Sequence, residues 1–138
     1  MKLTIQQWGS SLWDIIHIIS SINNFTVLKS HYKSFFDSLV NLIPCLVCKI
    51  HYMSYIRSYP ILKLKDSNNF CVWVNNLHNN VNRRTRKKIF SLEQSKKRYI
   101  HDNHIKITKN ICVILKYHIN TMTPLKFKSF KKMFSIKN

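Results

Sequence analysis

Two cysteines separated by two residues, Cys45 and Cys48, are the side chains of this chain best suited to chemistry. At this spacing, two thiols can close a small disulfide when oxidised, or supply half of a metal site when reduced. Pro44 precedes them and an apolar, helix-compatible run follows, and proline suits the first turn of a helix. We therefore expect both thiols in an N-terminal helical turn, where unpaired N–H groups and the helix dipole favour a thiolate.

The cysteine content and the apolar runs bound the class of protein. Four cysteines in 138 residues are too few for a disulfide scaffold. The longest N-terminal apolar run, Ile15 to Ile19, contains His17 and lacks a small-residue cleavage site, so we expect no signal peptide and no membrane span. The chain is thus expected to be cytoplasmic, where a Cys-x-x-Cys pair is more often catalytic or metal-binding than structural.

Basic residues are concentrated in the C-terminal part of the chain. Residues 83–138 hold 16 Lys and Arg against Glu93 and Asp102, a charge of +14 out of the total of +18. Such a distribution favours an anionic partner: nucleic acid, an acidic protein or a phosphate-bearing cofactor. A solvated basic face is the simpler explanation for most of these lysines.

Apolar residues recur at three- and four-residue steps, the period of a helix with one buried face. A first helix is predicted over residues 11–23, followed by a polar, loop-like stretch over residues 24–30. A second helix is predicted to end before Pro44. The third should run from the cysteine pair to Ser58, and the fourth should follow a cap at Asp66, Ser67 or Asn68.

The remaining pattern completes an all-α prediction. A fifth helix is predicted from about Ser91, where Ser91 and Gln94 have the spacing of a capping box. Residues 103–118 and 124–135 could each form a further helix. Gly9 is the only glycine, which excludes Gly-rich phosphate loops and argues against a sheet protein. We predict a four-helix bundle with a short fifth helix over residues 1–100, plus a basic C-terminal helical extension over residues 101–138.

Three clusters of aromatic, polar and thiol side chains lie on these predicted helices. Taken singly, a Trp or His at helical spacing is usually a core residue, and the cysteine pair is about as often metal-binding as redox-active. Only the order and spacing of the three clusters together indicate one site. The three clusters are Trp8-Gly9-Ser10-Ser11-Leu12-Trp13 with His17; Pro44-Cys45-Leu46-Val47-Cys48 with His51-Tyr52; and Trp73 with His78-Asn79-Asn80-Val81-Asn82.

These clusters resemble the motifs of the Erv/ALR family of flavin-linked sulfhydryl oxidases. The patterns W-G-x-x-x-W-x-x-x-H, P-C-x-x-C-x-x-H-[FY] and W-x-x-x-x-H-N-x-V-N all match, over roughly residues 8–100. The compact form is most similar to members carried by large cytoplasmic DNA viruses, which implies the host cytoplasm, and the virion, as locations. The resemblance also implies a homodimer through the first two helices, for which Tyr32, Phe35 and Phe36 could supply apolar contacts.

The resemblance implies a role for each matched residue. Cys45 would exchange disulfides with a substrate dithiol, and Cys48 would lie against the isoalloxazine ring of FAD. Electrons would pass from the substrate to the cysteine pair, then to FAD and to oxygen, giving hydrogen peroxide. A flavin needs flat apolar walls, hydrogen-bond partners and cations near its phosphates. The residues assigned to the cofactor are Gly9, Trp13, His17, Tyr52, Trp73, His78, Asn79, Val81, Asn82 and Lys87.

The chain also departs from the family pattern. Many members carry a second, structural disulfide, whose two positions here are Asn75 and Leu92. The paired loss indicates a subclass without that staple. The usual leucine after V-N is Thr85, and the usual glycine before the lysine is Arg86, which bears on the geometry around Lys87. Of the other two thiols, Cys71 is expected to be packed or free, and Cys112 to be inert.

A second interpretation is a zinc-containing, basic nucleic-acid-binding module. Cys45 and Cys48 would bind zinc together with His101 and His104, and the basic tail would contact phosphates. The interval between the two pairs is far longer than in a zinc finger. This alternative also leaves His17 and the H-N-N-V-N run unexplained. The predicted function is therefore an FAD-dependent thiol oxidase, and nucleic-acid binding through the tail is not favoured.

Overall fold

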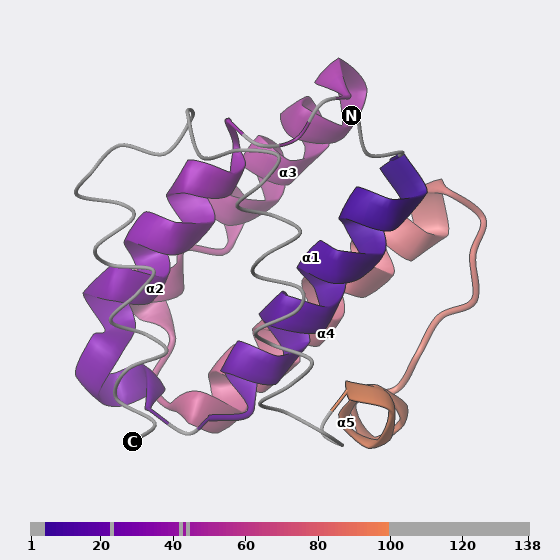
Figure 1. The fold of residues 1–138 in the computed structure, drawn as a ribbon. Coiled ribbons are helices and arrows are strands. Elements are labelled where there is room, and N and C mark those ends of the chain that lie inside the picture. The colour runs from indigo at the N-terminus through magenta and orange to yellow at the C-terminus, as the bar shows by residue number, and fades with distance from the viewer. Residues whose placement is uncertain (1–4, 23, 42, 44, 100–138) are drawn as a thin grey trace.

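The computed structural model describes residues 5–22, 24–41, 43 and 45–99, except for the side chains of residues 5–8 and 11. This part of the chain is helical and contains no strand, which confirms the predicted all-α class (Figure 1). The predicted extension over residues 101–138 lies outside it. The elements are α1 (Ile5–Ser20), α2 (Phe25–Leu39), α3 (Leu46–Ser58), the 3-10 helix η1 (Ile61–Lys63), α4 (Ser67–Arg84) and α5 (Leu92–Tyr99).

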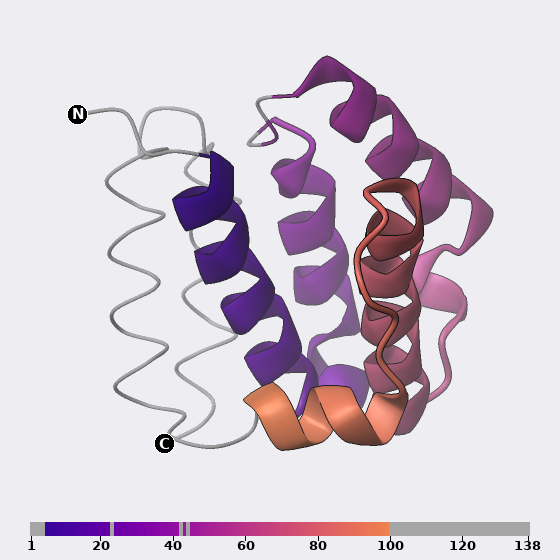
Figure 2. The same ribbon diagram turned by 90° about the vertical axis from the view of Figure 1, so that its right-hand side faces the viewer.

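Helices α1 to α4 form the bundle, and α5 closes one end of it. α1 packs on both α4 and α5, whereas α2 packs on η1 and α4. Figure 2 shows α5 lying crosswise at the end where α1 finishes and α4 begins. The segment after α4 returns along that helix to reach α5. No helix within the described ranges combines the length and apolar character that a membrane crossing needs.

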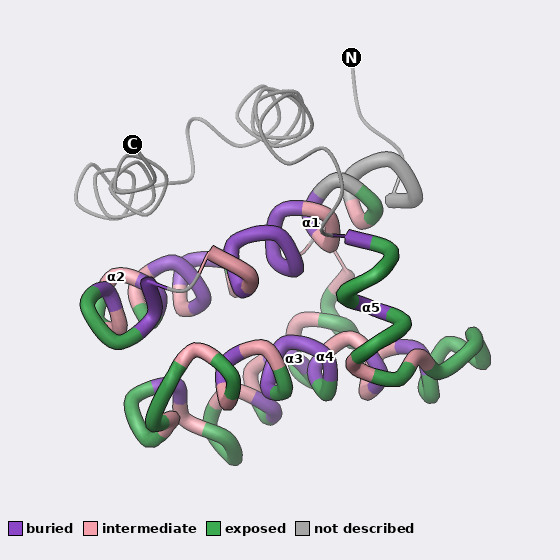
Figure 3. Tube along the Cα trace, turned by 90° about the horizontal axis from the view of Figure 1, so that it is seen from below, coloured by how far each residue is buried: buried purple, intermediate pink, exposed green. Residues whose placement is uncertain are grey.

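Aromatic rings from α2 and α4 fill the core. The ring centroids of Phe25 and Phe70 are 4.6 Å apart, and those of Phe36 and Trp73 are 5.0 Å apart. Figure 3 shows that the buried positions follow the faces the helices turn toward one another. Burial of one such ring stabilises the fold by about 1.5–3 kcal/mol.

This packing corrects one expectation about the dimer. Tyr32, Phe35 and Phe36 were candidates for an apolar contact between two copies. Each is at most 1% exposed and lies in the core of its own chain. They therefore hold α2 to the rest of the bundle and leave no surface for a second copy.

Helix α2 begins at Phe25, so the prediction of a loop over residues 24–30 is wrong. Phe25, Leu28 and Tyr32 are spaced for one helical face and are all buried. The polar residues between them obscured this stripe, because a partly polar helix face and a polar loop have similar composition. Leu28 departs from helical geometry, with φ −112° and ψ 21°, so the first turn is kinked. α1 also starts earlier than predicted, at Ile5.

The two predicted helix caps are confirmed. The Asp66 side chain accepts a hydrogen bond from the backbone N–H of Asn69 at 2.7 Å and begins α4. At α5, Ser91 Oγ accepts from the N–H of Gln94 at 3.1 Å, and Gln94 Oε1 accepts from the N–H of Ser91 at 2.9 Å. This reciprocal pair is the capping box that the sequence predicted.

Helix α4 ends in a turn that normally requires glycine. Arg86 has a φ of 58°, in the left-handed region. Its N–H donates to the carbonyl of Arg83 at 3.3 Å, and the N–H of Lys87 donates to that of Asn82 at 2.8 Å. These two bonds define a Schellman motif. The backbone conformation therefore suits glycine although the residue here is arginine, and Lys87 directly follows the strained position.

Arg86→Gly should raise the free energy of unfolding by about 0.5–1 kcal/mol, because it removes the cost of a left-handed arginine. Arg83→Gly removes the same charge from a regular turn of α4. It should lower the free energy of unfolding by about 1 kcal/mol. Urea denaturation of both variants measures the two effects, and destabilisation by Arg86→Gly would contradict the assigned backbone strain.

Candidate active site

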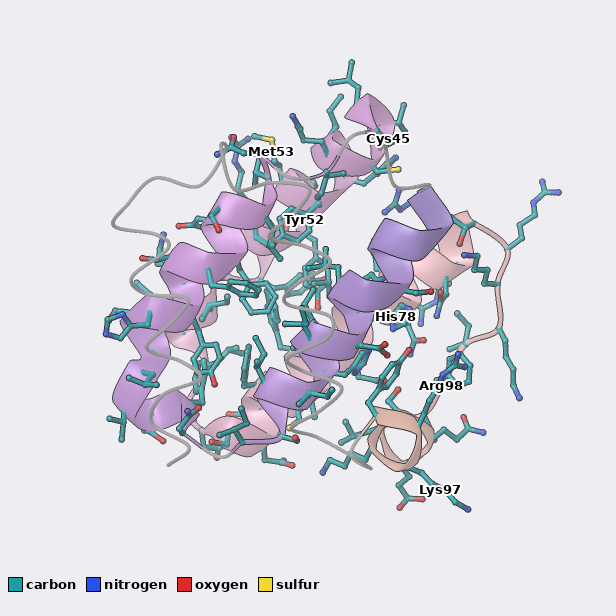
Figure 4. The ribbon with its side chains drawn as sticks, viewed as in Figure 1. Cys45, Tyr52, Met53, His78, Lys97 and Arg98 are labelled. Carbon is teal, nitrogen blue, oxygen red and sulfur yellow. The ribbon has the colours of Figure 1, made fainter. Side chains whose placement is uncertain are left out.

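The cysteine pair lies at the N-terminal end of α3, as predicted. Cys45 is the N-cap residue, and its Sγ accepts a hydrogen bond from the backbone N–H of Cys48 at 3.3 Å. Both thiols are free, with Cys45 half-buried and Cys48 exposed. Figure 4 shows Cys45 at the outer end of this helix, far from α5. A thiol of another protein can therefore reach the pair. Pro44 lies outside the described residues.

The two thiols differ in acidity. The thiol of Cys48 donates a hydrogen bond to Cys45, and this bond, followed by the Cys48 backbone N–H, lowers the pKa of the Cys45 thiol. The same thiol–thiol bond is the main cause that raises the pKa of Cys48. The cation of Arg84, at the end of α4, acts to lower both values. Cys45 is therefore the thiol that ionises first, as suits the cysteine that exchanges disulfides.

Four aromatic rings meet where α1, α4 and α5 come together. The rings of Trp13 and His78 stack at 3.9 Å between centroids, and those of His17 and Tyr99 stack at 4.1 Å. His17 Nε2 and His78 Nδ1 lie 2.8 Å apart, within hydrogen-bonding distance. The structure thus brings together three of the predicted cofactor residues. It adds Tyr99, which lies beyond the last matched motif; its only signal in the sequence was its four-residue spacing from Ser95, both buried on α5.

The two histidines of this cluster are neutral at physiological pH. Burial and then the neighbouring charge of His78 lower the pKa of His17 to about 3. Burial and then Arg98 and Lys87 lower the pKa of His78 to about 4. A neutral imidazole has one donor and one acceptor nitrogen, so the pair can share a single proton between Nε2 and Nδ1.

Asn75, one of the two positions where the family resemblance implies a second disulfide, is a buried amide that bonds to Ser95 of α5. Asn75 Nδ2 donates to the carbonyl of Phe90 at 3.2 Å, and Ser95 Oγ donates to Asn75 Oδ1 at 2.5 Å. Asn79 Nδ2 donates to the same carbonyl at 2.6 Å and Asn79 Oδ1 accepts from the N–H of Phe90 at 3.0 Å. The polar groups therefore tie α4 to α5 without a covalent bond. Because Asn79 is engaged in this way, its contact with FAD stays a prediction.

Asn82 provides the clearest opening for a ligand. Its Nδ2 is the only buried side-chain nitrogen or oxygen in the described part of the chain that lacks a hydrogen-bond partner. At Gly9, an added Cβ would meet no atom of the described residues within 4 Å. A buried amide donor without a partner is a group that a bound ligand can satisfy. Val81 is half-buried on α4, and Lys87 is exposed just after it.

Two other predicted cofactor residues lie in the core. Trp73 Nε1 donates to the carbonyl of Tyr59 at 2.8 Å, and the Tyr52 hydroxyl donates to the carbonyl of Phe36 at 2.6 Å. A cavity of about 550 Å³ between α3, η1 and α4 is lined by Trp73 but by no other predicted cofactor residue. The structure therefore does not bring Trp73 to the histidine cluster.

The described residues contain no group of three or more His, Cys, Asp or Glu side chains that could hold a metal ion. His101 and His104, which the zinc interpretation requires, lie outside the described ranges.

A helical bundle with a free dithiol at the start of α3, and with a cluster of stacked rings where α1, α4 and α5 meet, defines a helical dithiol protein. The chain belongs to the Erv1 / Alr family, whose sequence profile matches residues 10–100. This confirms the resemblance drawn from the three motifs.

Similar proteins come from large DNA viruses. Two isolates of African swine fever virus encode proteins named FAD-linked sulfhydryl oxidase that are 33% and 32% identical over 95 residues. Each alignment covers 67% of this chain and 79% of the relative. A probable FAD-linked sulfhydryl oxidase of Acanthamoeba polyphaga mimivirus is 30% identical over 95 residues, covering 65% of this chain and 66% of the relative. No solved structure matches the chain.

Acid should destabilise the fold, because both neutral histidines gain protons when the chain unfolds. Unfolded histidines titrate near pH 6.5, whereas His17 and His78 titrate near 3 and 4 in the folded protein. The free energy of unfolding is therefore not reduced by these histidines above pH 6.5, and it falls as the pH drops toward 4. The loss is at most about 1.4 kcal/mol per pH unit for each histidine, and less for the half-buried His78. Urea denaturation at pH 7 and pH 5 measures it.

Two variants separate this effect from general acid sensitivity. His17→Gln removes one titrating group and should flatten the dependence of stability on pH. His51→Gln changes an exposed histidine of α3 and should keep the original slope. Equal slopes in the two variants would show that His17 is not the group responsible.

Proposed function

We propose that this chain is an FAD-dependent thiol oxidase that forms disulfides in substrate proteins through Cys45 and Cys48. The observation that carries this conclusion is the free, reachable dithiol at the start of α3 in a member of the Erv1 / Alr family. The viral relatives named FAD-linked sulfhydryl oxidase support the cofactor and the reaction.

The acidity of the thiols indicates how the pair works. A substrate thiolate attacks Cys45 Sγ in the oxidised pair, and Cys48 leaves with the electron pair. The second substrate thiol then attacks the mixed disulfide, which releases Cys45 as a thiolate and leaves the substrate oxidised. A thiol of low pKa leaves faster, so the lowered pKa of Cys45 favours this second exchange. FAD, when bound, takes the two electrons from the reduced pair and delivers them to oxygen.

The residues at the cluster have distinct tasks in holding FAD. The stacked rings of Trp13, His17, His78 and Tyr99 offer flat surfaces for the ring systems of the cofactor. The free Nδ2 of Asn82 supplies a hydrogen-bond donor. The cations of Arg98 and Lys87 act on His78 and can offset the phosphate charge. Figure 4 labels Arg98 and His78. Gly9, Tyr52, Trp73, Asn79 and Val81 are assigned by family resemblance.

Three further features belong to the proposal. Oxygen is the electron acceptor, as the family resemblance implies. The protein acts as a homodimer, which only the family resemblance supports, because Tyr32, Phe35 and Phe36 are buried in their own chain. A cytoplasmic location is supported by the small number of cysteines.

Cys45→Ser and Cys48→Ser should each reduce dithiol-driven oxygen consumption at least about a hundredfold, because neither remaining thiol can close the disulfide. Both variants should still purify yellow with bound FAD, since other residues form the cofactor site. Oxygen-electrode traces and the flavin absorbance of each variant measure this. A folded, colourless protein that takes up zinc and not added FAD would overturn the proposed function in favour of the zinc module.

Cys71→Ser is the matched control. The Cys71 thiol donates to the carbonyl of Ser20 at 2.9 Å, away from the cysteine pair, and serine can make the same bond. Oxygen consumption should therefore stay close to the original rate. A large loss in this variant would show that the electron path includes a third thiol.

We further propose that residues 1–100 form the catalytic unit and residues 101–138 a docking element. The C-terminal segment holds eight lysines against one acidic residue, together with apolar residues at helical steps. Truncation after Asp102 should leave FAD binding and oxidation of a small dithiol within about twofold. It should weaken retention on an acidic surface, most clearly at low salt. Loss of flavin or precipitation of the shortened chain would place the segment in the core instead.

A further inference from the structure

Apolar side chains face solvent on the first two turns of α3, beside the cysteine pair. Leu46 is 69% exposed, Val47 is 61% exposed and Ile50 is 57% exposed. A surface helix normally turns such residues toward the core. In α3, Tyr52 and Tyr55 supply the buried face instead. The helix is therefore apolar on both sides, and the outer side has no partner within the described chain.

These three residues form one surface with the thiols; we call Leu46, Val47 and Ile50 the α3 patch. Leu46 and Ile50 are four residues apart and share a stripe of the helix, with Val47 on the adjacent stripe. Leu46 and Val47 are the two residues between Cys45 and Cys48. A polypeptide joined to Cys45 through a mixed disulfide therefore has its reacting cysteine next to the α3 patch.

A basic segment at the end of α4 contributes charge at the thiols. The charge of Arg84 acts on both thiols. The segment from Arg83 to Lys88 contains five Lys and Arg, all exposed. The site therefore combines an apolar contact surface with a positive potential, which attracts acidic segments of a partner.

We propose that the α3 patch docks the substrate polypeptide, and that preferred substrates carry an apolar residue next to the reacting cysteine and acidic residues further along the chain. The inference rests on the proposed thiol-oxidase function and names the substrate class of that site. The mixed disulfide with Cys45 holds the substrate cysteine at the first turn of α3. The neighbouring apolar side chain then covers Ile50 and Leu46, and this contact makes exchange with such substrates more frequent.

Reduced peptides with two cysteines provide the direct test. One peptide carries leucine beside each cysteine and two aspartates; a second carries serine and glutamine in those places; dithiothreitol is the small substrate. The full chain should oxidise the first peptide with a kcat/KM about tenfold above the second, the discrimination that a buried apolar contact supplies. Added salt should reduce the part of this preference due to the aspartates.

Ile50→Gln tests the patch itself without changing the residues between the cysteines. It should reduce the preference to about twofold while turnover of dithiothreitol and flavin absorbance stay unchanged. Leu62→Gln is the matched control, because Leu62 is 50% exposed on η1, beyond the other end of α3. This variant should keep the full preference. An undiminished preference in Ile50→Gln would overturn the proposal.

A binding measurement separates docking from catalysis. The leucine-flanked peptide with both cysteines replaced by serine should bind the full chain, and Ile50→Gln should weaken that binding several-fold by fluorescence anisotropy. This holds whether or not dithiothreitol is oxidised, so failure of the thiol-oxidase function would be seen separately. If Ile50→Gln changes the elution volume of the protein but not peptide binding, the patch is a contact between copies and the proposal is wrong.

Discussion

The site depends on the packing of α1 against α4. This contact places His17 beside His78 with 2.8 Å between ring nitrogens, in surroundings where burial keeps both imidazoles neutral. Two imidazolium cations at this distance would repel, so the contact excludes protonation of both rings at once. The same contact lets Trp13 stack on His78, and it positions His17 so that Tyr99 of α5 stacks on it. The four rings of this cluster are therefore positioned by α1 and α4 together with α5, which packs on both.

Buried amides of α4 attach α5 to the end of the bundle through hydrogen bonds. Asn75 and Asn79 converge on the backbone of Phe90, and Ser95 completes the group from α5. Hydrogen bonds of buried amides are individually modest but costly to break, because an unpaired buried amide loses its hydration as well. The attachment is directional and satisfies polar groups that α4 would otherwise bury alone. Within residues 5–99, Cys45 and Cys48 are therefore the only residues for which we propose disulfide chemistry.

Unlike the buried histidines and amides, the cysteine pair lies near the surface. Capping of α3 by Cys45 uses its Sγ as a hydrogen-bond acceptor, and that role stabilises the thiolate. The Cys48 thiol is the main cause of the lowered pKa of Cys45, and the Cys48 backbone N–H is the next. Because both groups lie within the same turn, the lowered pKa is a local property of that turn. The start of α3 determines where the Cys45 thiol lies. Arg84, which comes from α4, lowers the pKa of that thiol further.

Local patterns determined a large part of this protein without a structure. The apolar period predicted the all-α class, Asp66 and Ser91 predicted two helix starts, and the spacing of Cys45 and Cys48 placed the dithiol, because each depends on residues within one or two turns. The start of α2 was missed because Phe25 and Leu28 are buried by residues far along the chain. Likewise, only the tertiary structure decided that Trp73 lies in the core, that Tyr99 joins the histidines and that Asn82 is left unpaired. Those outcomes depend on which faces of α1, α4 and α5 meet, and contacts between distant segments leave no local period in the sequence.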